Sequence, residues 1–293
     1  MNKTIFNGFE NLDVEIMKIS DNPFKTFWDW YKMTWINLQN KEYDENDEEI
    51  KNACLDVLNN RALPTPQEMI QLELKITGLS RVGLAQITRG RVGFAYVVES
   101  QMPQKITHRV TVPKNLINSK FYNEIQELIL KSQKLYDAMY DDGIPPQDCR
   151  YLTMHGQQTN LIMGVNFLAL KGFFMMRAEN GLTDELNLVC RLIRKRLREY
   201  INTSNDKNWE YLFDKLDCIG ADRKVCLNYD KVFGNTGRYP SANDKIPSID
   251  GKIKPDYDFT KSAWYEELLE LDETLLFNDE KEMIRKWKDE KNY

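Results

Sequence analysis

Two arginines separated by one glycine, Arg89 and Arg91, are the side chains best placed to bind a charged ligand. They follow a segment whose apolar residues have helical spacing, so they are expected where a helix gives way to a loop. Each guanidinium group offers a planar fork of N–H donors that stays charged, which suits a phosphate group. The same pair would also fit an ordinary solvated helix end, so the spacing by itself leaves both interpretations open.

The elements that must position this pair form one continuous unit over residues 65–101. Apolar and polar residues alternate over 72–77, which predicts a strand with one buried face that ends at Gly78. Ser80 is suited to cap the helix that follows, and Gly90 is suited to end it. The unit is therefore expected to run from a turn through a strand and a helix into a polar loop.

Short motifs occur in order along this unit and again along residues 143–177. The first segment contains Thr65-Pro66-Gln67-Glu68, Gly78-Leu79-Ser80-Arg81, Gln86, Arg89-Gly90-Arg91, Phe94-Ala95-Tyr96 and Ser100-Gln101. The second segment contains Gly143, Pro145, Asp148, Arg150, Leu152, Thr159, Asn166 and Arg177. This order resembles the flavin-dependent (X-class) thymidylate synthases, which have a T-P-x-E turn, a G-[IV]-S-R helix ending in Arg-His-Arg, and a Ser-x-Arg-Tyr loop.

The resemblance implies a fold, a cofactor and a reaction. The fold is α/β (α+β), with a central antiparallel or mixed sheet flanked by helices over residues 1–201, followed by a loop-rich and then helical extension over 202–293. The implied reaction is an FAD-dependent transfer of a one-carbon group from methylenetetrahydrofolate to C5 of a pyrimidine deoxynucleotide, dUMP or dCMP, with NADPH as reductant. Members of the family are homotetramers, so the sites are expected to form between subunits.

Carried over position by position, the resemblance assigns two sets of site residues. The set expected to face FAD is Thr65, Glu68, Arg89, Arg91 and Asn166. The set expected to hold the nucleotide is Gln86, Ser100, Gln101, Arg150 and Arg177, with Arg150 toward the phosphate and Arg177 toward the base. Ser100 and Arg177 are the two expected to be catalytic. Asn166 and Arg177 would lie about three helical turns apart on one face, and an amide inside so apolar a helix needs a polar partner.

Several family positions carry other residues here. Gly90 replaces the histidine of Arg-His-Arg, Leu63 replaces the histidine before the turn, and Met102-Pro103 replaces the Arg-Tyr of the loop. On the apolar helix, Leu168 and Gly172 replace a basic residue and a histidine. Each loss would weaken ligand binding by about 1.5–3 kcal/mol if nothing compensates. The sequence therefore indicates a divergent member.

The divergence leaves three hypotheses open. The first is C5 modification of dUMP or dCMP, ending in a methyl or a hydroxymethyl group. The second is a different flavoenzyme on the same scaffold, and the third is a non-catalytic oligomeric member. The retained arginines and polar residues of the nucleotide set argue against the third.

Composition excludes other classes of function. The 293 residues are 42% hydrophobic and 29% charged, which is typical of a globular chain that can bury a full core. A net charge of −5 argues against a broad nucleic-acid or membrane-surface binder, so a nucleotide is the likelier anion. The start of the chain lacks the pattern of a signal peptide, and the apolar run 161–176 is too short to span a bilayer, so a cytoplasmic location is expected. Two histidines and five scattered cysteines give no metal centre and no disulfide framework.

The remaining helices are predicted from apolar spacing. An aromatic segment at 24–38 is expected in the core or in a subunit contact, and a second helix is expected at 48–59. A long helix is predicted over 122–142, stopped by Gly143, with the apolar stripe Ile125, Leu128, Ile129, Leu135 and Met139. A helix over 183–200 is expected to expose Arg191, Arg194, Lys195, Arg196 and Arg198 to solvent. A closing helix is predicted over 262–291, and Cys218 and Cys226 have the wrong spacing for a zinc knuckle.

Overall fold

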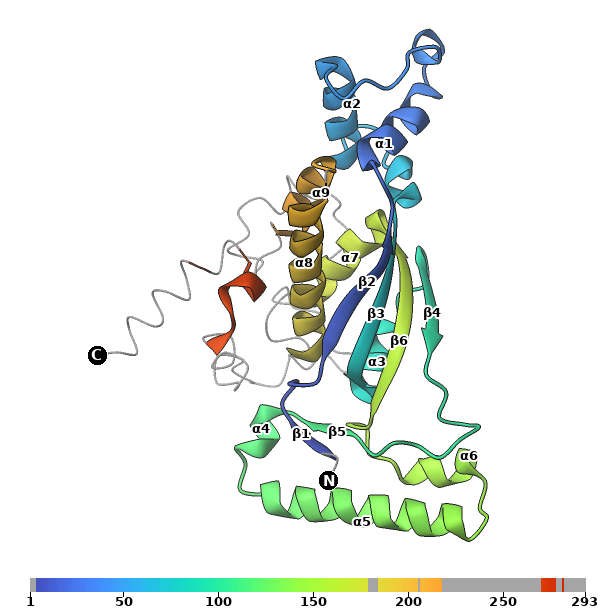
Figure 1. The fold of residues 1–293 in the computed structure, drawn as a ribbon, viewed down its shortest axis with the longest axis vertical. Helices are drawn as coiled ribbons and strands as arrows, with labels where there is room; N and C mark the ends of the chain where they lie inside the picture. Colours follow the sequence, from blue (N-terminus) through green and yellow to red (C-terminus); the bar gives the residue numbers. More distant parts are fainter. Residues whose placement is uncertain (1–3, 179–183, 205, 218–269, 278–280, 282–293) are drawn as a thin grey trace, which may run out of the picture. The chain divides into compact units, whose positions relative to one another are not determined.

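The computed structural model describes residues 4–178, 184–204, 206–217, 270–277 and 281 (Figure 1). Two compact units emerge from its internal contacts. Unit 1 consists of Met1–Met17 and Glu73–Gly164, and unit 2 of Lys18–Leu72 and Val165–Tyr293. Cys218, Cys226 and most of the segment 262–291 lie outside the described residues.

A four-stranded antiparallel sheet forms from strands that belong to distant parts of the sequence (Figure 1). The strand order is β2–β3–β6–β4. The strands are β2 (Asp13–Ile19), β3 (Gln71–Ser80), β6 (Gln158–Asn166) and β4 (Phe94–Val98). Leu72, Leu74 and Ile76 of β3 are fully buried, which confirms the alternation predicted for this strand. The expected α/β class with a central sheet and helices is thus confirmed.

The predicted end of β3 at Gly78 is wrong, since the strand continues to Ser80. Gly78 has a φ of +73°, and a Cβ at this position would lie 2.1 Å from the carbonyl oxygen of Asn11. Its N–H donates to the side chain of Asn160. The glycine permits a close approach of neighbouring backbone inside the strand rather than a break in it.

Unit 1 contains a second, two-stranded sheet covered by a long helix. Strands β1 (Ile5–Asn7) and β5 (Val110–Val112) pair in parallel. Short helix α4 (Lys114–Ile117) leads to α5 (Tyr122–Asp141), which packs Ile129 against Val110 and Val112. Helix α6 (Pro146–Cys149) and the 3-10 turn η3 (Arg150–Leu152) follow, and α3 (Arg81–Ile87) continues from β3.

The predicted apolar stripe of α5 is only partly correct. Ile129 is buried, but Leu128 and Leu135 are 57% and 49% exposed. Tyr136 is instead one of the buried side chains of the helix, at 1% exposure. Gly143 follows the helix with a φ of +87°, as expected for a helix stop.

Unit 2 is predominantly helical. Its elements are α1 (Pro23–Lys32), η1 (Ile36–Leu38), α2 (Glu48–Leu58), η2 (Thr65–Met69), α7 (Phe167–Arg177), α8 (Asp184–Thr203), α9 (Asn208–Asp217) and η5 (Glu273–Leu275). Phe24, Phe27 and Trp28 of α1 are buried, whereas Trp30 and Trp35 are 45% and 51% exposed, so only part of the predicted aromatic segment belongs to the core. Trp209 of α9 is also fully buried, and its indole N–H donates to the carbonyl of Ser20.

The arginine face predicted for α8 is not fully solvated. Arg191 and Arg194 are 0% and 5% exposed. Arg191 donates to the carbonyl of Leu275 and Arg194 to that of Leu276, and both guanidinium groups lie over the ring of Phe277. The prediction failed because residues more than eighty positions away cover this face.

Candidate functional site

The start of α3 is fixed by the side chain of Ser80. Its hydroxyl oxygen accepts a hydrogen bond from the N–H of Gly83 at 3.0 Å, as the sequence predicts for a helix cap. Arg81 is the first residue of α3. The cap therefore sets the position from which the Arg81 side chain leaves the helix.

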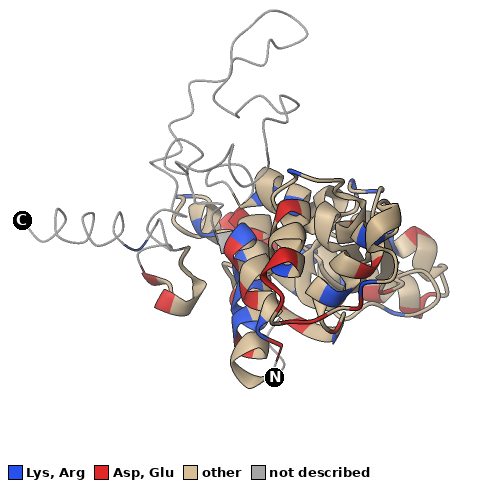
Figure 2. Cartoon of the chain, turned by 90° about the horizontal axis from the view of Figure 1, so that it is seen from above, with Lys and Arg blue, Asp and Glu red and all other residues tan. Residues whose placement is uncertain are grey.

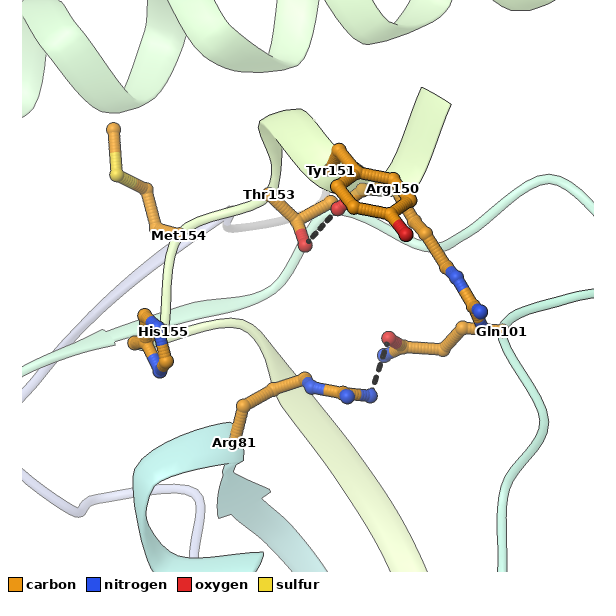
Figure 3. A pocket seen from close by; sticks show the side chains of 7 residues that line it. All are labelled: Arg81, Gln101, Arg150, Tyr151, Thr153, Met154 and His155. Atoms are coloured by element: carbon orange, nitrogen blue, oxygen red, sulfur yellow. Dashed lines mark hydrogen bonds between the residues drawn. The ribbon is translucent and has the colours of Figure 1, made fainter. Parts of the chain in front are cut away.

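Arg81 faces a cavity of about 310 Å³ within unit 1 (Figure 3). Its lining residues are Arg81, Gln101, Arg150, Tyr151, Thr153, Met154 and His155, and we call this space the arginine cavity. Figure 3 shows the side chains of Arg81 and Arg150 approaching Gln101 from different elements. Arg81 Nη1 donates to Gln101 Oε1 at 3.0 Å, and Gln101 Nε2 donates to the carbonyl of Gln158. The amide of Gln101, 7% exposed, thus holds Arg81 against β6.

The charge of the arginine cavity is favourable for an anion. Its described lining includes two guanidinium groups and one imidazole but no aspartate or glutamate. Arginine pairs well with phosphate because its N–H groups match the geometry of the phosphate oxygens. The volume falls in the range of about 300–1,000 Å³ that is common for small-molecule sites.

A larger hollow in unit 2 has the opposite character. It measures about 760 Å³, and its lining includes Asp21, Glu45 and Asp206. Burial raises the pKa of Asp206, although the backbone N–H groups of Asn22 and Asn208 favour its ionised form. These carboxyl groups would repel a phosphate. Figure 2 shows acidic and basic residues interspersed over the described helices. The sign of the charge in each hollow therefore depends on the residues that line it.

Two of the five residues predicted to hold the nucleotide meet in the arginine cavity, Gln101 and Arg150. Gln86 of α3 and the exposed Ser100 are not among its described lining. Arg81 was not among the predicted site residues, although it belongs to the Gly78-Leu79-Ser80-Arg81 motif. A signal was therefore present in the sequence, namely an arginine directly after a helix cap in a segment that already contains two others.

Arg89 and Arg91 are both exposed and follow α3, which ends at Ile87, three residues before Gly90, the expected end. Gly90 lies between them in a crowded position. A Cβ there would lie 2.9 Å from the ring of Phe94 and 3.2 Å from the hydroxyl of Tyr96. These two rings stack with centroids 5.8 Å apart, and the Tyr96 hydroxyl donates to the carbonyl of Ile87. The space next to Gly90 is therefore filled by two aromatic side chains.

The other predicted cofactor residues lie in unit 2. Thr65 and Glu68 belong to η2, and Asn166 is the last residue of β6 and the N-cap of α7. Its side-chain oxygen accepts from the N–H of Ala169 at 2.8 Å, so the amide expected inside the helix caps its start instead. Arg177 is the last residue of α7, and a Cβ added at Gly172 of the same helix would meet no neighbouring atom of the described residues within 4 Å.

The donor set of unit 1 fits the diphosphate of FAD in its chemistry. Two exposed arginines on one loop offer several charged N–H donors to such an anion. Among the described residues, no cluster of histidine, cysteine, aspartate or glutamate is arranged to hold a metal ion. None of the described helices has both the length and the apolarity required to cross a bilayer.

Comparison with known proteins identifies relatives of this chain. The model of the family described as "Thymidylate synthase complementing protein" matches residues 15–201. A flavin-dependent thymidylate synthase of Thermococcus onnurineus is 21% identical over 176 residues, which are 58% of this chain and 71% of that protein. The flavin-dependent thymidylate synthase of Saccharolobus solfataricus is 27% identical over 145 residues, 46% of this chain and 52% of that protein.

Solved structures share the fold. PolB from Streptomyces cacaoi, described as a UMP/dUMP methylase and solved with 5-Br dUMP, has a TM-score of 0.57 at 11% identity. The match covers 72% of this chain and 96% of the PolB chain. Thymidylate synthase X of Helicobacter pylori, solved with FAD and dUMP, has a TM-score of 0.53 at 16% identity and covers 70% and 98%. Because the family model spans more than half of the sequence, the chain belongs to the flavin-dependent thymidylate synthase family, as a divergent member in the class of flavin-dependent one-carbon transferases.

Proposed function

We propose that this protein methylates C5 of dUMP in an FAD-dependent reaction. The observation that carries the proposal is the arginine cavity, in which Arg81 and Arg150 converge on Gln101 without a carboxylate among the described lining. The family supports the reaction class, and the names of the structural relatives support dUMP as the substrate. The phosphate group of dUMP is a dianion, which two guanidinium groups favour.

Each site residue receives a role in this proposal. Arg150 and Arg81 bind the phosphate, and Gln101 orients Arg81 through its side-chain carbonyl. Gln86 and Ser100 bind the rest of the nucleotide, and Arg177 contacts the base, with Ser100 and Arg177 nearest the reacting carbon. Thr65, Glu68, Arg89, Arg91 and Asn166 bind FAD.

FAD would supply the hydride chemistry, while the residues of the chain bind and orient the ligands and exclude water from the site. Methylenetetrahydrofolate is the proposed one-carbon donor and NADPH the proposed reductant. We further propose a cytoplasmic homotetramer with sites between subunits, in which residues 202–293 extend the catalytic domain formed by 1–201.

A second candidate is C5 hydroxymethylation, or use of dCMP in place of dUMP. Gly90 favours it, because the family pattern that the sequence resembles has a histidine at this position, and here the adjacent space is filled by Phe94 and Tyr96. Groups that contact the flavin or the base edge govern both the choice of base and the fate of the transferred carbon.

The mass of the nucleotide product decides between the candidates. The purified full chain is incubated with FAD, NADPH, methylenetetrahydrofolate and either dUMP or dCMP, with a reaction lacking FAD as control. A methyl gain on dUMP alone supports the proposed function. A hydroxymethyl gain, or reaction of dCMP alone, supports the second candidate, and no product from either nucleotide contradicts both.

A further inference from the structure

Helix α5 contacts two of the segments that line the arginine cavity. One segment is residues 99–109 between β4 and β5, which we call the Gln101 loop. The other is η3, which begins with Arg150. All three lie in unit 1. The side chains of α5 that make these contacts include Ser132, Tyr136 and Asp137, and Asp141 adds a second carboxylate 3.4 Å from Lys105 Nζ.

Tyr136 joins the two segments through one buried side chain. Its hydroxyl accepts a hydrogen bond from the N–H of Ile106 in the Gln101 loop, at 3.2 Å. Its ring packs in a cluster with Ile106 and Cys149, and Cys149 directly precedes Arg150. Ser132 adds a second contact, because its hydroxyl donates to the carbonyl of Leu152 in η3.

Asp137 attaches the Gln101 loop to α5 through contacts with two basic side chains. Its Oδ1 lies 3.0 Å from Lys105 Nζ and 3.1 Å from His108 Nε2, and both partners belong to the loop. The contact with His108 lacks the geometry of a hydrogen bond, so its strength depends on the charge of the imidazole. Burial opposes ionisation of Asp137, yet Lys105 and His108 hold its pKa below the usual value.

These contacts lead from α5 to the phosphate-binding groups. The Gln101 loop carries the amide that accepts from Arg81, and this bond directs the guanidinium group of Arg81 in the cavity (Figure 3). We propose that Asp137 is a positioning residue for nucleotide binding, which acts through Lys105 and His108 on the Gln101 loop and through Gln101 on Arg81. This inference rests on the proposed function, because it assigns the phosphate to the arginine cavity.

The matched control is Asp142, which follows α5 by one residue. Its side chain is exposed and, within the described part of the chain, makes no hydrogen bond or ion pair. Asp142→Asn therefore removes the same charge near the same helix end without touching the Gln101 loop. His108→Gln tests the loop side of the contact, and Asp137→Glu keeps the charge.

The experiment measures the dissociation constants of dUMP and of inorganic phosphate by calorimetry for the full chain and these variants. Asp137→Asn and His108→Gln are expected to weaken dUMP binding by about tenfold, the change that corresponds to about 1.4 kcal/mol. Asp142→Asn should bind as the wild type does, and Asp137→Glu should recover most of the affinity. Hydrogen exchange over residues 100–108 should accelerate in the first two variants only. In turnover, KM should rise with little change in kcat.

Other outcomes separate this inference from the proposed function. Equal affinities in Asp137→Asn and Asp142→Asn overturn the positioning role, as does faster exchange in the Gln101 loop without weaker binding. If the wild type binds phosphate but not dUMP, the proposed function fails and the phosphate affinities of the variants decide the inference. If the wild type binds neither ligand, both are overturned.

Discussion

At the scale of single residues, Arg81 brings a second guanidinium group to the arginine cavity. Arg81 reaches the same cavity as Arg150 from the start of α3, and Gln101 holds it there. One of the two guanidinium groups of the cavity thus starts from a capped helix, which is a more rigid support than a loop.

Gly90 and Gly172, two glycines at positions where the resembled family pattern has histidines, lie in different surroundings. Gly90→Ala should lower the free energy of unfolding by about 1–3 kcal/mol, because the added methyl group meets the stacked rings of Phe94 and Tyr96. Gly172→Ala should raise it by about 0.5–1 kcal/mol, because the position lies inside α7 with free space among the described residues. Urea unfolding of both variants tests the pair, and shifts of the same sign would contradict it.

Lys171 gives the stability of unit 2 a pH dependence. Burial, and then the charge of Lys215, lower its pKa to about 7, so between pH 7 and its ordinary value of 10.5 the unfolded chain binds the additional proton. This group therefore makes the protein more stable as the pH rises through that window. Lys171→Met should be more stable than the wild type near pH 7, and the difference should shrink toward about pH 10.

Denaturant unfolding at the two pH values measures this difference. The control is Lys134→Met, which removes an exposed lysine in place of a buried one. A difference between Lys171→Met and the wild type that stays constant with pH would rule out the titration of Lys171 as its cause.

At the scale of elements, α8 is held by residues far along the chain. Arg194 is 5% exposed, donates to the carbonyl of Leu276, and lies over the rings of Phe213 and Phe277. The charged groups of α8 are therefore of two kinds, those that cover apolar rings and those that face water.

Arg194→Met and Arg196→Met separate these two kinds. Arg194→Met should lower the free energy of unfolding by about 1–3 kcal/mol, because it leaves the buried Leu276 carbonyl without its donor. Arg196 forms an ion pair with Glu199 on a more exposed part of α8, so Arg196→Met should stay within about 0.5 kcal/mol of the wild type. Equal losses in thermal or urea unfolding would show that the Leu276 contact contributes nothing.

Elements with a local cause could be predicted from the sequence, and those with a distant cause could not. The alternation in β3 and the Ser80 cap depend on neighbours in sequence, and both were predicted correctly. The conformation of Gly78 depends on the approach of Asn11, and the burial of Arg191 depends on Leu275 and Phe277. The period of the apolar residues and the helix or strand propensity of a segment carry no information on such distant contacts.

The same reasoning applies to the site. Gln101 and Arg150 were predicted from motifs, and the structure brings them together in one cavity. Arg81 was missed because its role depends on the return of residues 150–155 to the start of α3. The assignments of all the predicted site residues to FAD or to the nucleotide, Gln101 and Arg150 included, stay predictions.

At the scale of the whole molecule, the proposed site residues are divided between the two units. Unit 1 contributes Gln86, Arg89, Arg91, Ser100, Gln101 and Arg150, and unit 2 contributes Thr65, Glu68, Asn166 and Arg177. The described lining residues of the arginine cavity all belong to unit 1, so phosphate binding there can be tested with substitutions in unit 1. The central claim of the proposed function can thus be addressed by one comparison.

That comparison is the affinity for dUMP against the affinity for deoxyuridine, which lacks the phosphate. It is measured for the wild type, for the double variant Arg81→Gln/Arg150→Gln, and for Arg61→Gln, in which an exposed arginine of unit 2 is changed in the same way. The wild type and Arg61→Gln should prefer dUMP by about a hundredfold or more, since each charged contact contributes about 1.5–3 kcal/mol, and the double variant should lose this preference. Equal binding of both ligands by the wild type, or a preference that survives in the double variant, would contradict the assignment of the phosphate to the arginine cavity.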